Sequence, residues 1–300
     1  MDSAEPALAR LPGIAREAPA ETVADAPFML IEPLHRATPL ILSSPHSGRR
    51  YPADLIAATR LPLMSLRRSE DAYVDELFAG AAAFGAPVLC AAVARAYVDL
   101  NRDPAELDPA MFFDPPPRAA WPPSQRVQAG LGVLPRIAGD GEDIYRRRMP
   151  LAEAERRLLA VHRPYHVTLA GLIAESRTLF GKAVLLDCHS MPSSARGARD
   201  ADIVLGDRFG AACHPDLTAL VEQTLRAMGY RVSRNAPFAG GHTTQSYGRP
   251  TAAVHALQIE LNRGLYLQER SLTRSSGFDR VRADMTRLIE TLVSVECGLR

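Results

Sequence analysis

The sequence lacks the charge imbalance and the long apolar runs that mark several classes of protein. Thirty-five Lys and Arg against 34 Asp and Glu give a formal net charge of +1, and like charges form no block. This balance provides no electrostatic footprint for a nucleic acid. No apolar stretch approaches the about 18–20 residues of a membrane span. We therefore expect neither a nucleic-acid nor a membrane partner.

The sequence also lacks a secretory signal and a disulfide framework. Its first residues, MDSAEPALARLPGI, are acidic where a signal peptide is basic, and no apolar core follows them. The four cysteines contain no CxxC pair, which is typical of reduced thiols. They are Cys90, Cys188, Cys213 and Cys297. We expect a cytoplasmic protein, and the sequence leaves monomer and homodimer open.

The chain contains enough apolar material for one sizeable core, with 47% hydrophobic and 23% charged residues. Apolar runs of strand length alternate with helical patterns, which favours βαβ units. The predicted strands are Leu40–Ser44, Pro87–Val93, Ala183–His189, Asp202–Gly206 and Val254–Leu261. The predicted helices are Glu70–Phe84, Pro150–Arg177, Asp216–Met228 and Phe278–Val295.

These patterns predict one α/β domain over residues 27–300, with a mixed, mostly parallel sheet flanked by helices. No repeat or linker divides it. Residues 1–26, rich in Ala, Pro and Glu, are expected to form a loosely ordered arm. The proline-rich stretch 112–132, FFDPPPRAAWPPSQRVQAGLG, is predicted to hold no regular element and to lie as a long ordered loop over a site.

Two predicted strands end in histidine. In LLDCHS, Asp187 and His189 point to one face of an extended strand and Cys188 to the other. A Cys–His nucleophile pair is therefore disfavoured, and a metal-ligating His189 with Asp187 beside it is favoured over a buried structural histidine. SSPHSG places His46 at a second strand end. Because ligands bind at the carboxyl ends of strands in open α/β sheets, the two histidines can converge.

Two histidines and one carboxylate, with a position left for water, make a catalytic zinc site. SEDAYVDEL at 69–77 supplies carboxylates near a helix start, Asp71 foremost, with Glu70 as the alternative. Glu260, on one strand face with Gln258, is a candidate general base. The competing interpretation of Glu260 is a salt bridge to Arg263 or Arg102.

Two further segments carry polar residues that can hold an anionic substrate. In AYVDLNRDP, Asn101 and Arg102 can together bind a carboxylate, and Arg263 and Arg249 can join Arg102 in a clamp for an anionic substrate. His242 follows the double glycine of NAPFAGGHTTQ and can contact the substrate or polarise its carbonyl. HRPYH at 162–166 has metal-binding spacing for a helix, but Pro164 and the missing HExxH glutamate favour hydrogen-bonding or core histidines.

Several segments together resemble the N-formylglutamate amidohydrolase family, in the expected order from about residue 30 to residue 290. They are SPHSGRRYP (44–52), DAYVDELF (71–78), ARAYVDLNRDP (94–104), LLDCHSMPS (185–193), ADIVLGDRFG (201–210) and LQIELNRGLY (257–266). The resemblance implies a zinc-exopeptidase (carboxypeptidase)-like fold and hydrolysis of N-formyl-L-glutamate to formate and L-glutamate, a step of histidine degradation.

Carried over by position, the resemblance implies one zinc ion held by His46, Asp71 and His189, a base at Glu260, and substrate arginines at 102 and 263. Histidine-degrading members tend to read TDWHVD where this chain has EDAYVD at 70–75. That difference keeps the carboxylate ligand but leaves the acyl group open. The alternatives are a deacylase or carboxypeptidase for another N-acyl amino acid, or a non-catalytic protein that binds small acidic molecules.

Overall fold

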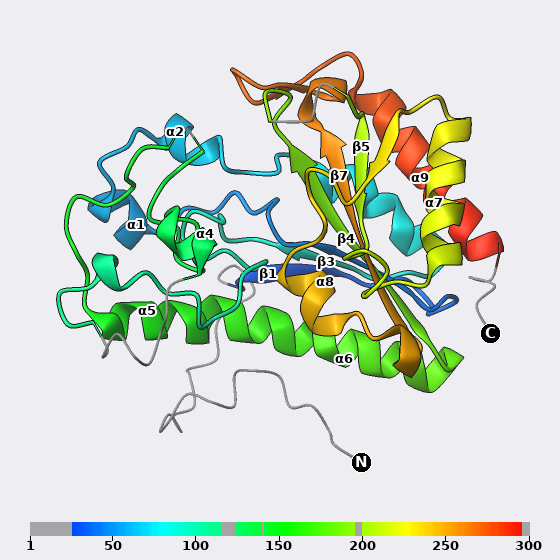
Figure 1. Ribbon diagram of the computed structural model, residues 1–300, viewed down its shortest axis with the longest axis horizontal. Coiled ribbons are helices and arrows are strands. Elements are labelled where there is room, and N and C mark those ends of the chain that lie inside the picture. Colours follow the sequence, from blue (N-terminus) through cyan, green and yellow to red (C-terminus); the bar gives the residue numbers. More distant parts are fainter. Residues whose placement is uncertain (1–25, 116–123, 140, 196–199, 296–300) are drawn as a thin grey trace.

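The computed structural model describes residues 26–115, 124–139, 141–195 and 200–295. The predicted arm at 1–26 therefore lies outside the described residues except for Ala26. A seven-stranded sheet runs through the molecule in the order β1-β3-β2-β4-β7-β5-β6 (Figure 1). Its strands are β1 (Phe28–Ile31), β2 (Leu40–Ser44), β3 (Val88–Ala91), β4 (Ala183–Met191), β5 (Ile203–Gly206), β6 (Val232–Arg234) and β7 (Val254–Asn262). A separate hairpin joins β8 (Leu267–Gln268) and β9 (Thr273–Arg274).

The predicted mixed, mostly parallel sheet is confirmed. Strands β3, β2, β4 and β7 run parallel to one another, and β5 runs parallel to β6. The two antiparallel contacts are β1 with β3 and β5 with β7. All five predicted strands are present within two residues of their predicted bounds. The strands β1 and β6 were not predicted; they are partly exposed, unlike the similarly short but fully buried β3 and β5.

Helices cover both faces of the sheet (Figure 1). The long α6 (Arg163–Phe180) packs on β2 and β4 from one face, whereas α3 (Val74–Phe78) packs on the same strands from the other. Helix α9 contacts both α3 and α7. Alternation along β4 divides the core accordingly: Leu185 faces one apolar cluster, and Leu186 and Cys188 face the other. The remaining helices are α1 (Ala53–Ala58), α2 (Leu63–Arg67), α7 (Pro215–Ala227), α8 (His242–Tyr247) and α9 (Phe278–Ser294), with short 3-10 turns η4 (Pro109–Met111), η6 (Pro250–Ala252) and η7 (Arg263–Leu265).

The prediction of one continuous helix over 70–84 is wrong. The backbone N–H of Asp71 donates to the carbonyl of His46 at 3.0 Å, so this residue is held outside any helix. Tyr73 then adopts a left-handed conformation with φ of 64°, which is uncommon for a bulky residue. The helix α3 starts only at Val74 and ends at Phe78, and a 3-10 segment, η3 (Ala79–Phe84), continues it.

The helix predicted over 150–177 forms, but in three segments. They are α5 (Leu151–Arg157), a π-helical turn η5 (Leu158–His162) and α6 (Arg163–Phe180). Pro164 has no N–H to donate to the preceding turn, and a wider turn at this point accommodates that loss. The helix therefore passes the proline without ending there.

The proline-rich stretch 112–132 differs from its prediction in one respect. Its second part contains the short helix α4 (Gln125–Gln128), whose N-terminus is capped by Ser124 Oγ accepting from the N–H of Val127 at 3.2 Å. The prolines lie before this cap, so they do not interrupt it. Residues 116–123 lie outside the described residues. Among the described residues, no helix combines the length and apolarity needed to cross a membrane.

Candidate active site

His46 and His189 meet at the carboxyl ends of neighbouring parallel strands. His46 lies two residues beyond β2, and His189 lies on β4, which pairs with β2. The two ring centroids are 4.7 Å apart, and both side chains are buried. A parallel sheet brings the ends of adjacent strands to one edge, which is the convergence that the sequence predicted.

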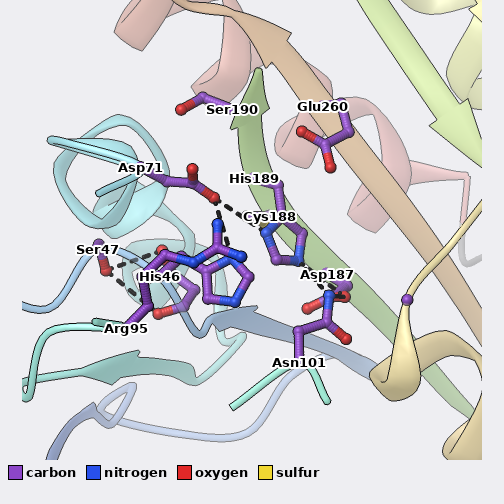
Figure 2. A network of polar contacts seen from close by, with 12 residues as sticks. His46, Ser47, Asp71, Arg95, Asn101, Asp187, Cys188, His189, Ser190 and Glu260 are labelled. Atoms are coloured by element: carbon purple, nitrogen blue, oxygen red, sulfur yellow. Dashed lines mark hydrogen bonds and ion pairs between the residues drawn. The ribbon is translucent and has the colours of Figure 1, made fainter. Parts of the chain in front are cut away.

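Asp71 is the carboxylate that faces both histidines (Figure 2). Its Oδ2 lies 3.0 Å from His189 Nδ1 and 3.4 Å from His46 Nδ1. Glu70 points elsewhere, because it accepts hydrogen bonds from the Tyr51 hydroxyl at 2.7 Å and from Arg67 Nε at 3.1 Å. Of the two carboxylates that the sequence left open, the structure thus brings Asp71 to the histidines.

The outer nitrogen of each histidine contacts a carboxylate. His46 Nε2 lies 2.7 Å from Asp99 Oδ1, and His189 Nε2 lies 3.0 Å from Asp187 Oδ2. Such contacts fix the ring orientation and leave Nδ1 of each ring facing Asp71, as is typical of metal-ligating histidines. The predicted proximity of Asp187 to His189 is confirmed by this distance.

The donor set fits a divalent metal ion. One ligand atom from each of His46, Asp71 and His189 lies within 4.8 Å of the others. His46 Nδ1 is buried and has no hydrogen-bond partner in the part of the chain that the structure describes, which is costly unless something else uses its lone pair. Two imidazoles and one carboxylate are the ligand type of catalytic zinc sites.

The surroundings of His189 favour positive charge at this point. Burial alone would lower the pKa of His189, but the negative charge of Asp187 and its hydrogen bond outweigh burial and raise the pKa well above the usual range. A bound cation would satisfy the same surroundings in place of this proton.

Glu260 lies on β7 directly opposite His189 in the parallel register. Burial raises the pKa of the Glu260 carboxyl to about 7. Gln258 Nε2 donates to Glu260 Oε1 at 2.9 Å. Within the described part of the chain, Glu260 forms no ion pair with Arg263 or Arg102, so the competing salt-bridge interpretation is not what the structure shows. A carboxyl with a pKa near neutrality is suited to accept and return a proton.

These side chains open into one cavity of about 790 Å³, within the range of small-molecule sites. Cationic side chains are numerous in its lining. The arginines are Arg68, Arg95, Arg102, Arg126, Arg208 and Arg263. Arg102 donates to the backbone oxygens of Leu131 and Asn101 and, within the described ranges, to no carboxylate, so its charge is available to an anionic ligand.

Arg263 and Asn101 line the cavity, but each also holds another site residue. Arg263 Nη2 donates to Asp71 Oδ1 at 3.0 Å, so this arginine fixes the carboxylate that faces the histidines. Asn101 Nδ2 lies 3.2 Å from Asp187 Oδ2 and 3.0 Å from His189 Nε2. Their predicted contacts with substrate remain predictions.

His242 does not lie among the residues that line the cavity. The preceding Gly241 lies against Asn101, because a Cβ on Gly241 would stand 2.4 Å from Asn101 Nδ2. This close approach carries the chain past the cavity, and the His242 ring lies beside His162 and His166 instead. Contact between His242 and substrate therefore stays a prediction without support from the residues that line the cavity.

Arg95 is a cavity residue that the sequence reasoning missed. Its Nη2 lies 2.7 Å from Asp99 Oδ2, and Figure 2 shows the guanidinium beside His46 and Asp71. Asp99 is thus shared between Arg95 and His46. The available signal was an arginine inside the otherwise apolar run ARAYV, four residues before an aspartate.

Comparisons with known proteins agree with this geometry. The family model for N-formylglutamate amidohydrolase matches residues 38–267. An N-formylglutamate deformylase of Pseudomonas aeruginosa is 34% identical over 264 residues, covering 85% of this chain and 93% of the relative. One from Pseudomonas putida is 33% identical over 240 residues, covering 77% of this chain and 82% of the relative.

A solved structure of the same family is also similar to this chain. The crystal structure of N-formylglutamate amidohydrolase from Ralstonia eutropha JMP134 matches with a TM-score of 0.84 at 36% identity, covering 92% of this chain and 99% of that one. The named relatives and this structure support a hydrolase that acts on an amide.

Proposed function

The chain belongs to the N-formylglutamate amidohydrolase family, and from this premise we propose that it hydrolyses N-formyl-L-glutamate to formate and L-glutamate, as a step of histidine degradation. One zinc ion, held by His46, Asp71 and His189, is part of the proposal. The observation that carries it is the position of Glu260, opposite His189 with a raised pKa, in an arginine-lined cavity.

The bound ion would polarise the formyl carbonyl and increase the acidity of a water molecule. Glu260 takes a proton from the attacking water as the new C–O bond forms at the formyl carbon. The C–N bond then breaks, and Glu260 returns this proton to the departing nitrogen, so that formate and the free amine of glutamate result. A pKa near 7 suits both transfers.

The arginines of the cavity are proposed to orient the substrate by binding its carboxylates. N-formylglutamate carries two carboxylates, and Arg102 provides a guanidinium that no carboxylate of the described chain neutralises in an ion pair. Asn101 and Arg263 lie on the side of the histidines and are the proposed further contacts. Holding both carboxylates at the arginines would place the formyl group toward Glu260.

A formate-release assay tests the proposal. Purified protein is given N-formyl-L-glutamate before and after removal of metal with a chelator, and then after zinc is restored. We expect formate release that the chelator abolishes and zinc restores. N-acetyl-glutamate, N-succinyl-glutamate and peptide analogues are tested as alternative substrates, with release of the free amine as the common measurement. Preference for one of these analogues, or activity that survives complete metal removal, would contradict the proposal.

A further inference from the structure

Three further histidines lie together next to the backbone of residues 100–102, which carries Asn101 and Arg102 of the candidate active site. His162 ends the π-helical turn η5, His166 lies in the first turn of α6, and His242 begins α8. One ring nitrogen of each lies within 4.8 Å of one ring nitrogen of the others. The ring centroids are 4.3 Å apart for His162 and His166, and 5.6 Å for His166 and His242.

We propose that this three-histidine cluster is a second metal site, for a divalent transition-metal ion such as zinc, separate from the site at His46, Asp71 and His189. Imidazole ligands suit zinc, copper and nickel, whereas magnesium and calcium require oxygen ligands. Three histidines with one position left for another ligand make a known type of zinc site.

The first argument is which ring nitrogen carries the lone pair in His162 and His166. His162 Nε2 lies 3.0 Å from the carbonyl oxygen of Arg102, and His166 Nε2 lies 2.8 Å from that of Leu100. A carbonyl oxygen can only accept, so Nε2 carries the hydrogen in both rings and Nδ1 carries a lone pair. Donation from the outer nitrogen to a backbone carbonyl is the arrangement usual for metal-ligating histidines.

The second argument is that these lone pairs are poorly used by the protein itself. His162 is 1% exposed, and its Nδ1 is buried with no hydrogen-bond partner among the described residues. A buried polar atom left in this state is rare and costly. His166 Nδ1 faces the Tyr247 hydroxyl at 2.9 Å, but that hydroxyl has a second acceptor in the His166 carbonyl at 3.2 Å. A metal ion can therefore displace the hydroxyl without leaving it unpaired.

The ring of His242 is likewise free of strong hydrogen bonds within the described residues that would compete with a metal ion. Both nitrogens of His242 lie 3.3 Å from the hydroxyl of Ser246, one turn along the same short helix. No stronger contact within the described residues holds the ring. His242 is only partly buried, so an ion can reach the cluster from its side.

The charge state of the rings agrees with this geometry. Burial lowers the pKa of His162 to about 4 and lowers the pKa values of His166 and His242 as well. All three rings are therefore neutral at pH 7, the form that binds metal. The alternative role is structural, with His162 and His166 only supporting the backbone on either side of Asn101.

Metal stoichiometry separates the two roles. Chelator-treated protein is equilibrated with Zn²⁺, and bound zinc is counted by elemental analysis alongside calorimetric titration. We expect two equivalents in the wild type and one in His242→Ala, with affinity at the second site reduced at least about 100-fold.

The controls keep the two sites distinguishable. His255→Gln changes a buried histidine that contacts His214 outside both sites, and it should keep two equivalents. Asp71→Asn should weaken the first site alone, so loss of that equivalent bears on the proposed function and not on the cluster. A single equivalent that Asp71→Asn loses and His242→Ala retains, or two equally tight equivalents in a folded His242→Ala variant, would overturn the second site. His162→Gln, checked by circular dichroism, repeats the test on a buried ligand.

Discussion

Asp99 Oδ1 lies 2.7 Å from His46 Nε2, and the other oxygen of the same carboxylate lies 2.7 Å from Arg95 Nη2. The positive charge of Arg95 and the contact with His46 outweigh the effect of burial and hold the pKa of Asp99 well below its usual range. Asp99 is therefore a carboxylate at neutral pH. It orients the His46 ring from behind, with Nδ1 toward Asp71.

Replacing Asp99 by Asn should weaken zinc binding at the first site. The amide keeps the size of the side chain but removes the charge that supports His46, and changes of this kind cost about 10–100-fold in metal affinity. Competition with a chromophoric chelator measures the dissociation constant. Asp143→Asn, which affects an exposed ion pair with Arg136, is the control. Equal affinities in both variants would show that Asp99 does not support a ligand.

Glu260→Gln should keep the zinc but lose about 100- to 10,000-fold in kcat, the usual contribution of a general base. The amide cannot accept the proton of water, whereas it can still contact Gln258. Formate release and zinc content are measured on the same preparation. A variant that retains both near-normal turnover and full zinc would remove Glu260 from this role.

The wild type should lose kcat/KM at acidic pH. The base works only when deprotonated, and burial places the pKa of Glu260 at about 7 in the metal-free protein. A bound cation favours the carboxylate, so in the zinc form the limb lies at or below that value. Below it, activity should fall about tenfold for each pH unit. An acid limb that is unchanged in zinc-saturated Glu260→Gln would argue against this assignment.

Gly241→Ala should reduce activity. The added Cβ would stand 2.4–2.6 Å from the Asn101 side-chain amide, so either Asn101 or the chain before α8 must move. Movement of Asn101 disturbs its contacts with Asp187 and His189. Gly171→Ala is the matched control, because nothing lies within 4 Å of that Cβ on the exposed side of α6. It should raise stability by about 0.5–1 kcal/mol in thermal or urea unfolding, with activity unchanged.

Arg102→Gln should raise KM about 10- to 100-fold, the range expected when one charged hydrogen bond of about 1.5–3 kcal/mol is lost. A smaller change in kcat is expected if this arginine binds ground state and transition state alike. Steady-state formate release provides both constants. Arg177→Gln on the exposed end of α6 is the control. An unchanged KM would place the substrate carboxylates elsewhere in the cavity.

The sequence alone determined the central part of the candidate site. Strand alternation put Asp187 and His189 on one face and Cys188 on the other, and the structure agrees. The carboxyl ends of parallel strands share one edge of a sheet, so convergence of His46 and His189 could be expected from the sequence, and the pairing of β2 with β4 made them neighbours. The same period of two placed Gln258 and Glu260 on one face, where they are in contact.

Tertiary structure alone decided which neighbouring groups serve those residues. Glu70 and Asp71 are adjacent acids whose side chains point to different partners. The local backbone has a left-handed residue at Tyr73 and a hydrogen bond from the N–H of Asp71 to the carbonyl of His46. Arg263 binds Asp71 across 192 residues of chain, and His242 lies beside His162, while the neighbouring Gly241 packs on Asn101. Local periodicity carries no information on such contacts, because they depend on how loops and helices far apart in sequence pack together in space.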